Sequence, residues 1–449
     1  MALITINEIS ANLAYQYGTT GDSPTPSPTP SPTPGPTPVS RQVYTATISY
    51  EKDPMASVTY SDDALGKRPI MVSANYTDMG DWGNAFFMPK PCMLNYDGTV
   101  AYYLNPNDYT KKADGTASDV ANSDFPGNAM MEWPLIWYRF RSEGISGQWS
   151  ISVSNEQVDE DYNCWCNHDC NGNISPHFYT SIYNVTGTSK FRSLSGVTCT
   201  PENGCGHTTI YEEQARAKAN NTTDNVEWFT STYSMFELIY ALLIMVGKCA
   251  AVQYVFGEGL LNSGINDYVS GTVNDKGLFY GDVSYNNKPV KIFGMENWYG
   301  YKWDRLAGLY AFQYKFWCKK TWNTEDGTGT VGYPPDSYAT AGFIDITPNS
   351  GVPSYYRGYI TQYMGSPHGI VPRFTAEYDS HISGFYAQHH EYYGSYYDYS
   401  TGYEEGMVGG PSLDGNYGMY SGVGWSFVIS GSGYDYSSTR LTCIPTAST

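Results

Sequence analysis

The stretch that decides the fold is residues 294–304, GMENWYGYKWD. Two tryptophans stand on either side of Gly300, and paired large aromatic residues around a glycine suit a buried turn of a β-sheet. We therefore expect Trp298 and Trp303 to pack in the core rather than to contact a ligand. The stretch points to a fold and not to a binding site.

The composition around this stretch is typical of a recognition protein built from strands and loops. The 449 residues include 46 Gly and 43 Tyr, and 15% of them are charged, against a usual ~25%. The formal net charge is -19, with 25 Lys and Arg in the whole chain. Binding to nucleic acid or to an anionic membrane needs clustered Lys and Arg, so both partners are disfavoured.

The N-terminal segment lacks the features of a secretory signal peptide, which are a basic region, a long apolar core and a small-residue cleavage site. The longest apolar run, residues 238–246, is about half of the ~20 residues that span a membrane. We therefore expect synthesis in a cytoplasm and no membrane insertion.

Residues 23–38 read SPTPSPTPSPTPGPTP, with proline at every second position. Proline fixes φ and excludes a helix, so residues 23–40 are predicted to form a polyproline-II linker of about 3.1 Å per residue. The apolar side chains of residues 1–22 suffice to dock on a partner but not to fold alone. We interpret this segment as an anchor peptide; the alternative is a disordered tail ahead of an enzyme domain.

The rest of the chain is predicted to be β-rich α+β. Alternation and β-branched residues indicate strands within residues 42–60. Residues 131–141, MEWPLIWYRFR, are predicted to form one strand, with residues 149–153 as its neighbour across a turn at 142–147. Strands and helices do not alternate as in a doubly wound nucleotide-binding fold.

Two helices are predicted from capping boxes, in which a Ser or Thr and a Glu three residues later satisfy each other's backbone N–H groups. The first begins at Thr209 with Glu212 and runs to about Ala219. The second begins at Ser234 with Glu237 and ends near Gly247. Since this second segment is apolar almost all round, we expect it to be buried.

The nine cysteines are expected to be reduced, because their number is odd and no secretion signal is present. The dense cluster CWCNHDC at residues 164–170 is followed by Cys199 and, six residues later, Cys205. Three interpretations stay open for it: a zinc site of unusually tight spacing, a local disulfide, or ordinary loop thiols. The last is favoured, and no metal or other cofactor is predicted.

Three parts of the chain together resemble a known family. Residues 67–100, from KRPI to NYDGTV, resemble tail-associated proteins of phages that infect gut bacteria. Residues 257–259 and 294–304 are similar to the core motif of C-type-lectin-like domains of the formylglycine-generating-enzyme subclass. Residues 424–427 and 438–443 resemble its closing strands. That subclass includes the variable proteins of diversity-generating retroelements; Tyr299 departs from it, since the family usually has Gly there.

The resemblance implies a phage-tail receptor-binding protein, which would be made in the host cytoplasm and carried on the virion. It assigns residues 41–120 to a β-rich N-terminal part and residues 121–449 to a C-type-lectin-like ligand-binding domain. Residues 1–22 would attach to another virion tail protein, and the domain would bind a host surface glycan or protein. A homo-oligomer is compatible with this arrangement.

The expected ligand-binding residues are tyrosines near the C-terminus. Between Tyr386 and Tyr436 there are 11 Tyr in 51 residues, among Gly, Ser, Asp and Asn and without Lys or Arg. This is the composition of an antibody-like paratope. The alternative is a β-rich core or a polar surface, but Tyr doublets place one ring on each side of a strand. The candidate binding residues are Tyr392, Tyr393, Tyr396, Tyr397, Tyr399, Tyr403, Tyr417, Tyr420, Tyr434 and Tyr436.

In the resembling variable proteins, diversified positions come from adenine-rich codons, which yield Tyr, Asn, Ser, Asp and Gly but not Glu, Met or Trp. Diversification of this segment is a hypothesis that rests on the resemblance alone. It implies that five other residues belong to the framework: Glu404, Glu405, Met407, Met419 and Trp425.

The competing function is a virion-associated glycan depolymerase. A glycoside hydrolase needs two carboxylates at a set separation, and the candidates are Asp304, Asp345, Glu377, Asp379 and Glu391. The pair His389-His390 beside Glu391 favours a solvated loop over a metal site, because adjacent side chains diverge on a strand. The reactive cysteine pair of formylglycine-generating enzymes has no counterpart here, since Cys318 and Cys443 stand far apart in sequence. We therefore expect a binding protein and not an enzyme.

Overall fold

The chain divides into two compact units, residues 1–40 and 41–449. Of the first, the structure, a computed structural model, describes only Ser40. In the second it describes residues 41–49, 57–73, 75–143, 148–169, 171–206, 208–250, 252–260, 268–283, 288–312, 315–320, 344–345, 360–366, 369–374, 387–389, 404–408, 425–429 and 437–446.

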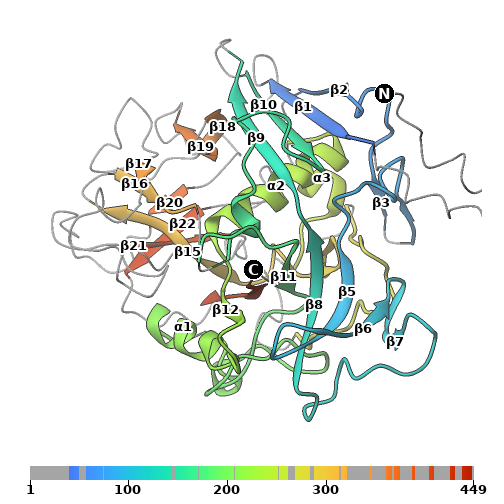
Figure 1. Cartoon of the computed structure of the whole chain (residues 1–449), viewed down its shortest axis with the longest axis vertical. Helices are drawn as coiled ribbons and strands as arrows, with labels where there is room; N and C mark the ends of the chain where they lie inside the picture. Colours follow the sequence, from blue (N-terminus) through green and yellow to red (C-terminus); the bar gives the residue numbers. More distant parts are fainter. Residues whose placement is uncertain are drawn as a thin grey trace, which may run out of the picture. The chain divides into compact units, whose positions relative to one another are not determined.

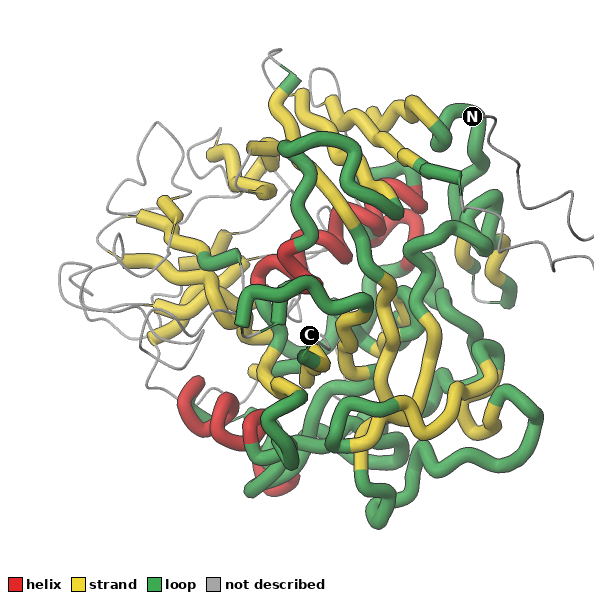
Figure 2. The backbone as a smooth tube through the Cα atoms, in the orientation of Figure 1, coloured by secondary structure: helices red, strands yellow, loops and turns green. Residues whose placement is uncertain are grey.

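This second unit is β-rich with few helices, as predicted. Figure 2 shows that strands and their connections make up most of the described chain. Three larger sheets contain most of the strands, and separate two-stranded hairpins contain the others (Figure 1). No helix in the described ranges is long and apolar enough to cross a membrane.

The first sheet has four antiparallel strands in the order β2-β1-β10-β9. The strands expected within residues 42–60 are confirmed as β1 and β2, and the pairing of residues 149–153 with the strand before them is confirmed as β10 on β9. The strands are β1 (Val43–Ser49), β2 (Ser57–Asp62), β9 (Trp137–Ser142) and β10 (Gln148–Ser154).

The second sheet has seven strands in the order β12-β24-β11-β8-β5-β6-β7. It combines strands from before and after residue 120, and buried residues from Tyr44 to Ile444 form one continuous core. The strands are β5 (Lys90–Asn95), β6 (Val100–Asn105), β7 (Asp108–Lys112), β8 (Gly127–Pro134), β11 (His177–Ser181), β12 (Val226–Thr230) and β24 (Leu441–Pro445).

The third sheet has the order β17-β16-β15-β21-β22-β20, and β23 also pairs with β15. Its strands are β15 (Trp303–Phe312), β16 (Lys315–Cys318), β17 (Ile344–Asp345), β20 (Ala387–His389), β21 (Glu404–Val408), β22 (Trp425–Ile429) and β23 (Ser437–Ser438). The two-stranded hairpins are β3 (Met71–Val72) with β4 (Thr77–Asp78), β13 (Lys291–Ile292) with β14 (Met295–Glu296), and β18 (Ile360–Ser366) with β19 (Gly369–Phe374).

The single strand predicted over residues 131–141 is wrong, because two strands occupy this stretch. β8 ends at Pro134 and continues the seven-stranded sheet, whereas β9 begins at Trp137 in the four-stranded sheet. Proline lacks the N–H that would extend the ladder. The N–H of Ile136 in the break donates instead to the Asn167 side chain, at 3.4 Å.

The first predicted helix is confirmed as α1 (Ile210–Lys218). Thr209 is its N-cap, and both halves of the capping box with Glu212 are present. The helix lies against β12, and its last turn carries Arg216 and Lys218, where cations favour the helix dipole.

The second predicted helix is α2 (Tyr233–Gly247), and every one of its residues is buried, as expected. It contacts β1, β15 and β19 (Figure 1). Its predicted cap is wrong: Thr232 is the N-cap and accepts from the Met235 N–H. Ser234 lies inside the first turn, where its hydroxyl donates to the Lys320 carbonyl. The short α3 (Gln253–Phe256) follows.

A disulfide joins Cys199 to Cys205, with Cα atoms 5.2 Å apart, so the expectation of reduced thiols is wrong for this pair. The 3-10 turn η3 (Pro201–Asn203) and the left-handed Gly204 fold the chain back between the two cysteines. This brings the Cα atoms within the range that a disulfide spans.

The stretch 294–304 is buried except at Trp303. Trp298 is buried and stacks on Phe236 of α2, with ring centroids 5.5 Å apart, which confirms its core role. Trp303 opens β15 and is partly buried, so the expected place in the core holds for it only in part.

Gly300 is required by a close approach of two backbones. A Cβ at Gly300 (φ +74°) would lie 2.4 Å from the Glu258 carbonyl oxygen, and one at Gly259 would lie 2.7 Å from the Gly300 Cα. The Leu260 N–H donates to the Gly300 carbonyl at 2.5 Å. Only glycine leaves room for this contact. Tyr299 is fully buried, and its hydroxyl donates to the Gly257 carbonyl at 2.7 Å, so it joins the same two segments.

Candidate functional site

The ten candidate tyrosines, from Tyr392 to Tyr436, lie outside the described residues. The strands that flank them are described, so the points where each tyrosine-bearing segment leaves and rejoins the sheet are known. Residues 390–403 connect β20 to β21, residues 409–424 connect β21 to β22, and residues 430–436 connect β22 to β23.

Strand pairing fixes the ends of these three segments. β21 and β22 are antiparallel, with Glu404 opposite Ile429 and Val408 opposite Trp425. β20 runs parallel to β22, so His389 lies on the side toward Ile429. Residues 390–403 therefore start and finish at one end of the sheet, and residues 409–424 start and finish at the opposite end.

The framework residues that the sequence indicated fall mainly in these strands. Glu404, Glu405 and Met407 belong to β21, and Trp425 begins β22; Met419 lies outside the described residues. The four strands β20 to β23 contain none of the ten tyrosines. Four of the five framework residues thus occupy paired positions in β21 and β22, whereas the ten tyrosines fall in sequence between the described strands.

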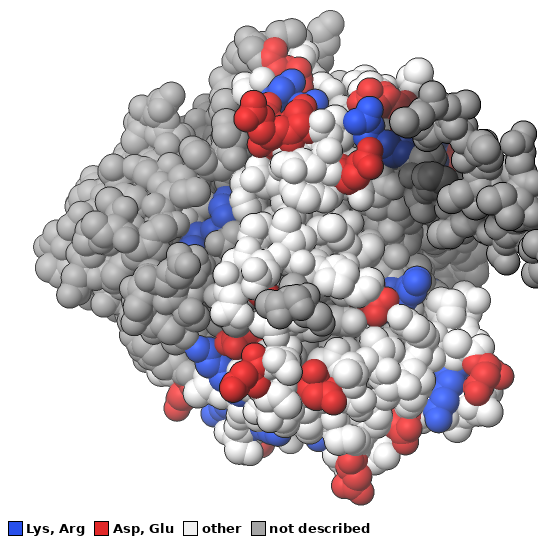
Figure 3. All heavy atoms as spheres, in the orientation of Figure 1, with Lys and Arg blue, Asp and Glu red and all other residues white. Residues whose placement is uncertain are grey.

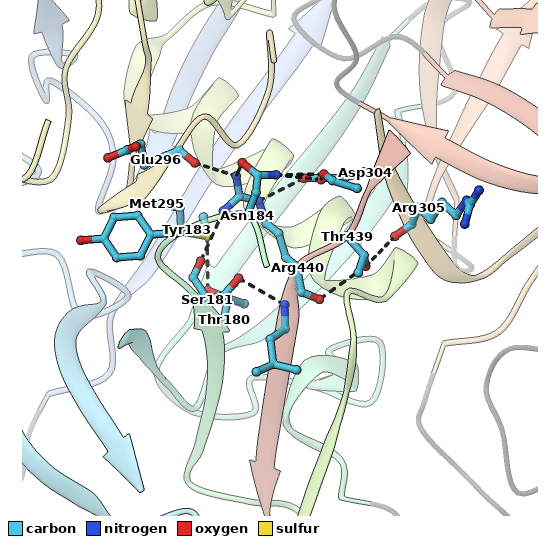
Figure 4. A network of polar contacts seen from close by, with 12 residues as sticks. Thr180, Ser181, Tyr183, Asn184, Met295, Glu296, Asp304, Arg305, Thr439 and Arg440 are labelled. Carbon is cyan, nitrogen blue, oxygen red and sulfur yellow. Dashed lines mark hydrogen bonds and ion pairs between the residues drawn. The ribbon is translucent and has the colours of Figure 1, made fainter. Parts of the chain in front are cut away.

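Asp304 anchors the sheet that carries these segments. Its backbone pairs with Val408 of β21 and with Ser438 of β23. Its buried carboxylate accepts hydrogen bonds from Arg440 Nε at 3.0 Å, from Asn184 Nδ2 at 3.1 Å and from the Ser438 hydroxyl (Figure 4). Burial raises the pKa of this carboxyl, while Arg440 and the two other donors act in the opposite direction.

Arg440 is 1% exposed, yet its guanidinium is fully hydrogen-bonded. Besides Asp304, it donates to the backbone carbonyls of Ser181, Ile182 and Glu296 at 3.3, 3.4 and 2.7 Å, and to Asn184 Oδ1 at 3.4 Å (Figure 4). A buried cation is tolerated only when its donors find such acceptors. The network joins β11, β14, β15 and β23 at a single point.

Two further buried ion pairs attach the same sheet to the helices. Arg305 Nη1 of β15 lies 3.0 Å from Glu213 Oε1 of α1. The Lys320 ammonium, just after β16, pairs with Glu237 of α2. The second Glu237 oxygen accepts the Ile370 N–H of β19 at 2.7 Å. Three buried pairs thus attach the sheet to the helices and the core, and a supported base is what a loop-borne binding site requires.

Glu296 and the nearby Lys291 are buried polar residues whose hydrogen bonds connect neighbouring segments of the chain. The Glu296 carboxylate accepts hydrogen bonds from the Tyr268 hydroxyl at 2.7 Å and the Gly271 N–H at 2.8 Å. Lys291 Nζ donates to the Val273 carbonyl at 3.0 Å and lies 3.6 Å from the centre of the Tyr109 ring. Burial lowers the pKa of Lys291 to about 7, against the opposing charge of Glu296.

Asp304 was one of the carboxylates considered for glycoside hydrolysis, and its surroundings do not suit that role. The cavity beside it has a volume of about 10 Å³, which is room for about one water molecule. Its carboxylate is held by Arg440 and is buried. For the other candidates, the structure describes only the backbone of Asp345 in β17 and leaves undescribed Glu377, Asp379 and Glu391.

The cluster at residues 164–170 does not gather its described side chains around one point. Cys164 Sγ lies 3.6 Å from His168 Nε2, whereas Cys166 Sγ makes a 3.4 Å contact with the Tyr138 hydroxyl. Burial raises the pKa of the Cys164 thiol to about 12. Cys170 lies outside the described residues. Among the described residues, no group of three or more His, Cys, Asp or Glu could hold a metal ion.

His389 ends β20, and His390 lies outside the described residues, so the structure places no side chain of this pair. Comparison with models of protein families and with curated proteins finds no match for the chain.

Proposed function

We propose that the chain is a receptor-binding protein of a phage tail and that its tyrosine-rich segments bind the host surface. One observation carries the proposal: ten tyrosines fall in the connections of one sheet, and the strands β20 to β23 contain none of them. A framework of strands with tyrosine-rich connections is the arrangement by which paratopes present their contacts.

The composition of these segments supports a ligand without strong charge. Tyrosine offers a large amphipathic contact at low entropic cost, and Gly, Ser and Asn add adaptable hydrogen bonds. Residues 386–436 contain no Lys or Arg, so phosphate-rich ligands lack a cationic partner there. A neutral glycan or a protein surface fits this chemistry.

The described part of the face in Figure 3 also lacks a large patch of one charge. Figure 3 shows Lys and Arg beside Asp and Glu in small groups, without a broad patch of either sign on the described part of this face. Arg139 lies 2.9 Å from Asp159, and Arg141 lies 2.7 Å from Asp161. With these cations paired and a formal net charge of -19 over the whole chain, a polyanion is not attracted electrostatically.

A C-type-lectin-like fold of the formylglycine-generating-enzyme subclass is part of this proposal. The stretch 294–304 leads directly into β15, which is the strand that receives β21 and β23. Residues 257–260 pack against Gly300, so the two segments that resemble the family motif are in contact. The segments that resemble its closing strands, residues 424–427 and 438–443, overlap the beginnings of β22 and β24.

A binding protein and a depolymerase differ in what they do to the host glycan. Purified protein incubated with capsular glycan of a susceptible host is expected to leave the polymer length unchanged, because binding has no turnover. Size-exclusion chromatography after prolonged incubation measures the length. Oligosaccharide that accumulates with time would contradict the proposal and favour the depolymerase.

Residues 1–22 are proposed to attach the protein to another virion tail protein, with the proline-rich stretch as spacer. Deletion of residues 1–22 is expected to give a folded protein that no longer joins the virion, because the spacer separates the segment from the domain. Mass spectrometry of virions from a deletion strain measures incorporation. Normal incorporation would contradict the anchor role.

A further inference from the structure

A surface groove of about 560 Å³ is formed by residues of the N-terminal half and of the segment before β13. Its walls come from three places in the sequence: residues 75–83 around β4, the β6–β7 turn at Pro106 and Asn107, and residues 275–280. Its volume falls in the ~300–1,000 Å³ range of small-molecule sites.

The groove is held in shape by the core beneath it. The Thr77 hydroxyl donates to the Phe279 carbonyl at 2.8 Å, which ties two walls together. Phe279 is buried and packs on Phe293, with ring centroids 4.9 Å apart. The Gly294 N–H donates to the Leu278 carbonyl at 2.7 Å. A site that is formed before its ligand arrives loses less entropy on binding.

The polar groups of the lining are balanced in charge. Asp275 and Lys276 form an ion pair, with Nζ 3.1 Å from Oδ2, and the other polar side chains include the neutral amides of Asn75 and Asn107. One cation already paired with a carboxylate gives little affinity for phosphate or another anion. Two amides and a carboxylate supply donors and acceptors for a ligand rich in hydroxyl groups.

Two aromatic rings complete the lining. Tyr76 is 59% exposed, and Tyr280 is partly buried with its ring 5.9 Å from Lys276 Nζ. An exposed ring beside hydrogen-bonding groups offers a flat apolar face and a polar rim. A pyranose has the matching surfaces, since its C–H face is apolar and its edge carries hydroxyls.

We propose that this groove binds an uncharged sugar, with a C–H face on Tyr76 or Tyr280 and hydroxyls on Asn75, Asn107 and Asp275. This proposal does not depend on the function proposed for the tyrosine-rich segments. It would give the protein a second contact with a glycan.

The test is saturation-transfer NMR on the full-length protein with glucose, galactose, mannose and N-acetylglucosamine, each supplied alone. At least one sugar is expected to receive saturation from the protein. The signal is expected to fall at least about tenfold in Tyr76→Ala and in Asp275→Ala. Both side chains are largely exposed, so melting should stay as in the wild type.

Tyr254→Ala is the matched control, because Tyr254 is 45% exposed and does not line the groove; it should retain the signal. Replacement of Tyr396, Tyr397 and Tyr399 should retain it as well, which separates this site from the proposed receptor face. Absence of transfer to all four sugars would overturn the inference. An undiminished signal in folded Tyr76→Ala and Asp275→Ala would overturn it too.

Discussion

Replacement of Tyr396, Tyr397 and Tyr399 by Ala together is expected to abolish binding to host cells. Tyrosines at the centre of an interface commonly contribute ~2 kcal/mol or more each, and a loss of ~2 kcal/mol weakens binding about 30-fold. Loss of three such contacts should therefore take binding below detection. Flow cytometry of labelled protein on a host strain that binds the wild type measures the effect.

The fold should survive this triple substitution. Surface substitutions usually change stability by less than ~0.5 kcal/mol, and the described strands β20 and β21 contain none of the three tyrosines. Trp298→Ala is the opposite control, because removal of a buried Trp typically costs ~3–5 kcal/mol. A triple variant that melts early, or one that melts normally and still adsorbs, would show that the binding face lies elsewhere.

Asp304→Ala is expected to destabilise the protein by ~3–5 kcal/mol, because it leaves the buried Arg440 without its countercharge. The carboxylate also accepts hydrogen bonds from Asn184 and Ser438, and the substitution leaves those groups unsatisfied. The change should loosen the attachment of β15 to β23 and to the core. Urea denaturation followed by tryptophan fluorescence measures the free energy of unfolding.

Asp161→Ala is the matched control for this ion pair. Asp161 and Arg141 are paired at 2.7 Å with side chains 59% and 51% exposed, and exposed pairs contribute little. A second comparison is the double variant Asp304→Leu with Arg440→Met, which should lose less stability than the two single changes added together. An Asp304→Ala protein as stable as Asp161→Ala would contradict the buried network.

Local sequence signals predicted the elements that are stabilised locally. The capping box of Thr209 and Glu212 lies entirely within α1, so the start of that helix could be read from four residues. The same pattern at Ser234 and Glu237 failed. Those two side chains are satisfied by Lys320, 83 or more residues away, and a contact of that range leaves no trace in a short window of sequence.

The break between β8 and β9 shows a second kind of feature that the sequence predicts only in part. The aromatic and β-branched residues of 131–141 favour a strand on both sides of Pro134. Proline indicates an interruption, but the transfer of the chain from the seven-stranded to the four-stranded sheet depends on partners distant in sequence. The sequence therefore predicts the missing N–H of Pro134, but it does not predict that the chain passes from one sheet to another.

In the candidate site, too, the sequence predicted some features and not others. The family resemblance predicted that Glu404, Glu405, Met407 and Trp425 belong to the framework, and these four residues lie in paired strands. The ion pairs that hold the sheet join residues 92 and 136 positions apart, namely Arg305 with Glu213 and Arg440 with Asp304. The groove at Tyr76 likewise combines three distant segments, and no motif marks it in the sequence.

The central claim is that this protein binds a host surface through its C-terminal domain. The measurement that tests it most directly is the equilibrium binding of labelled full-length protein to a panel of gut bacterial isolates, followed by flow cytometry over a range of protein concentrations. If the protein binds a host receptor, saturable binding to some isolates and none to others is expected. Binding that fails to saturate on every isolate, or no binding to any of them, would contradict it.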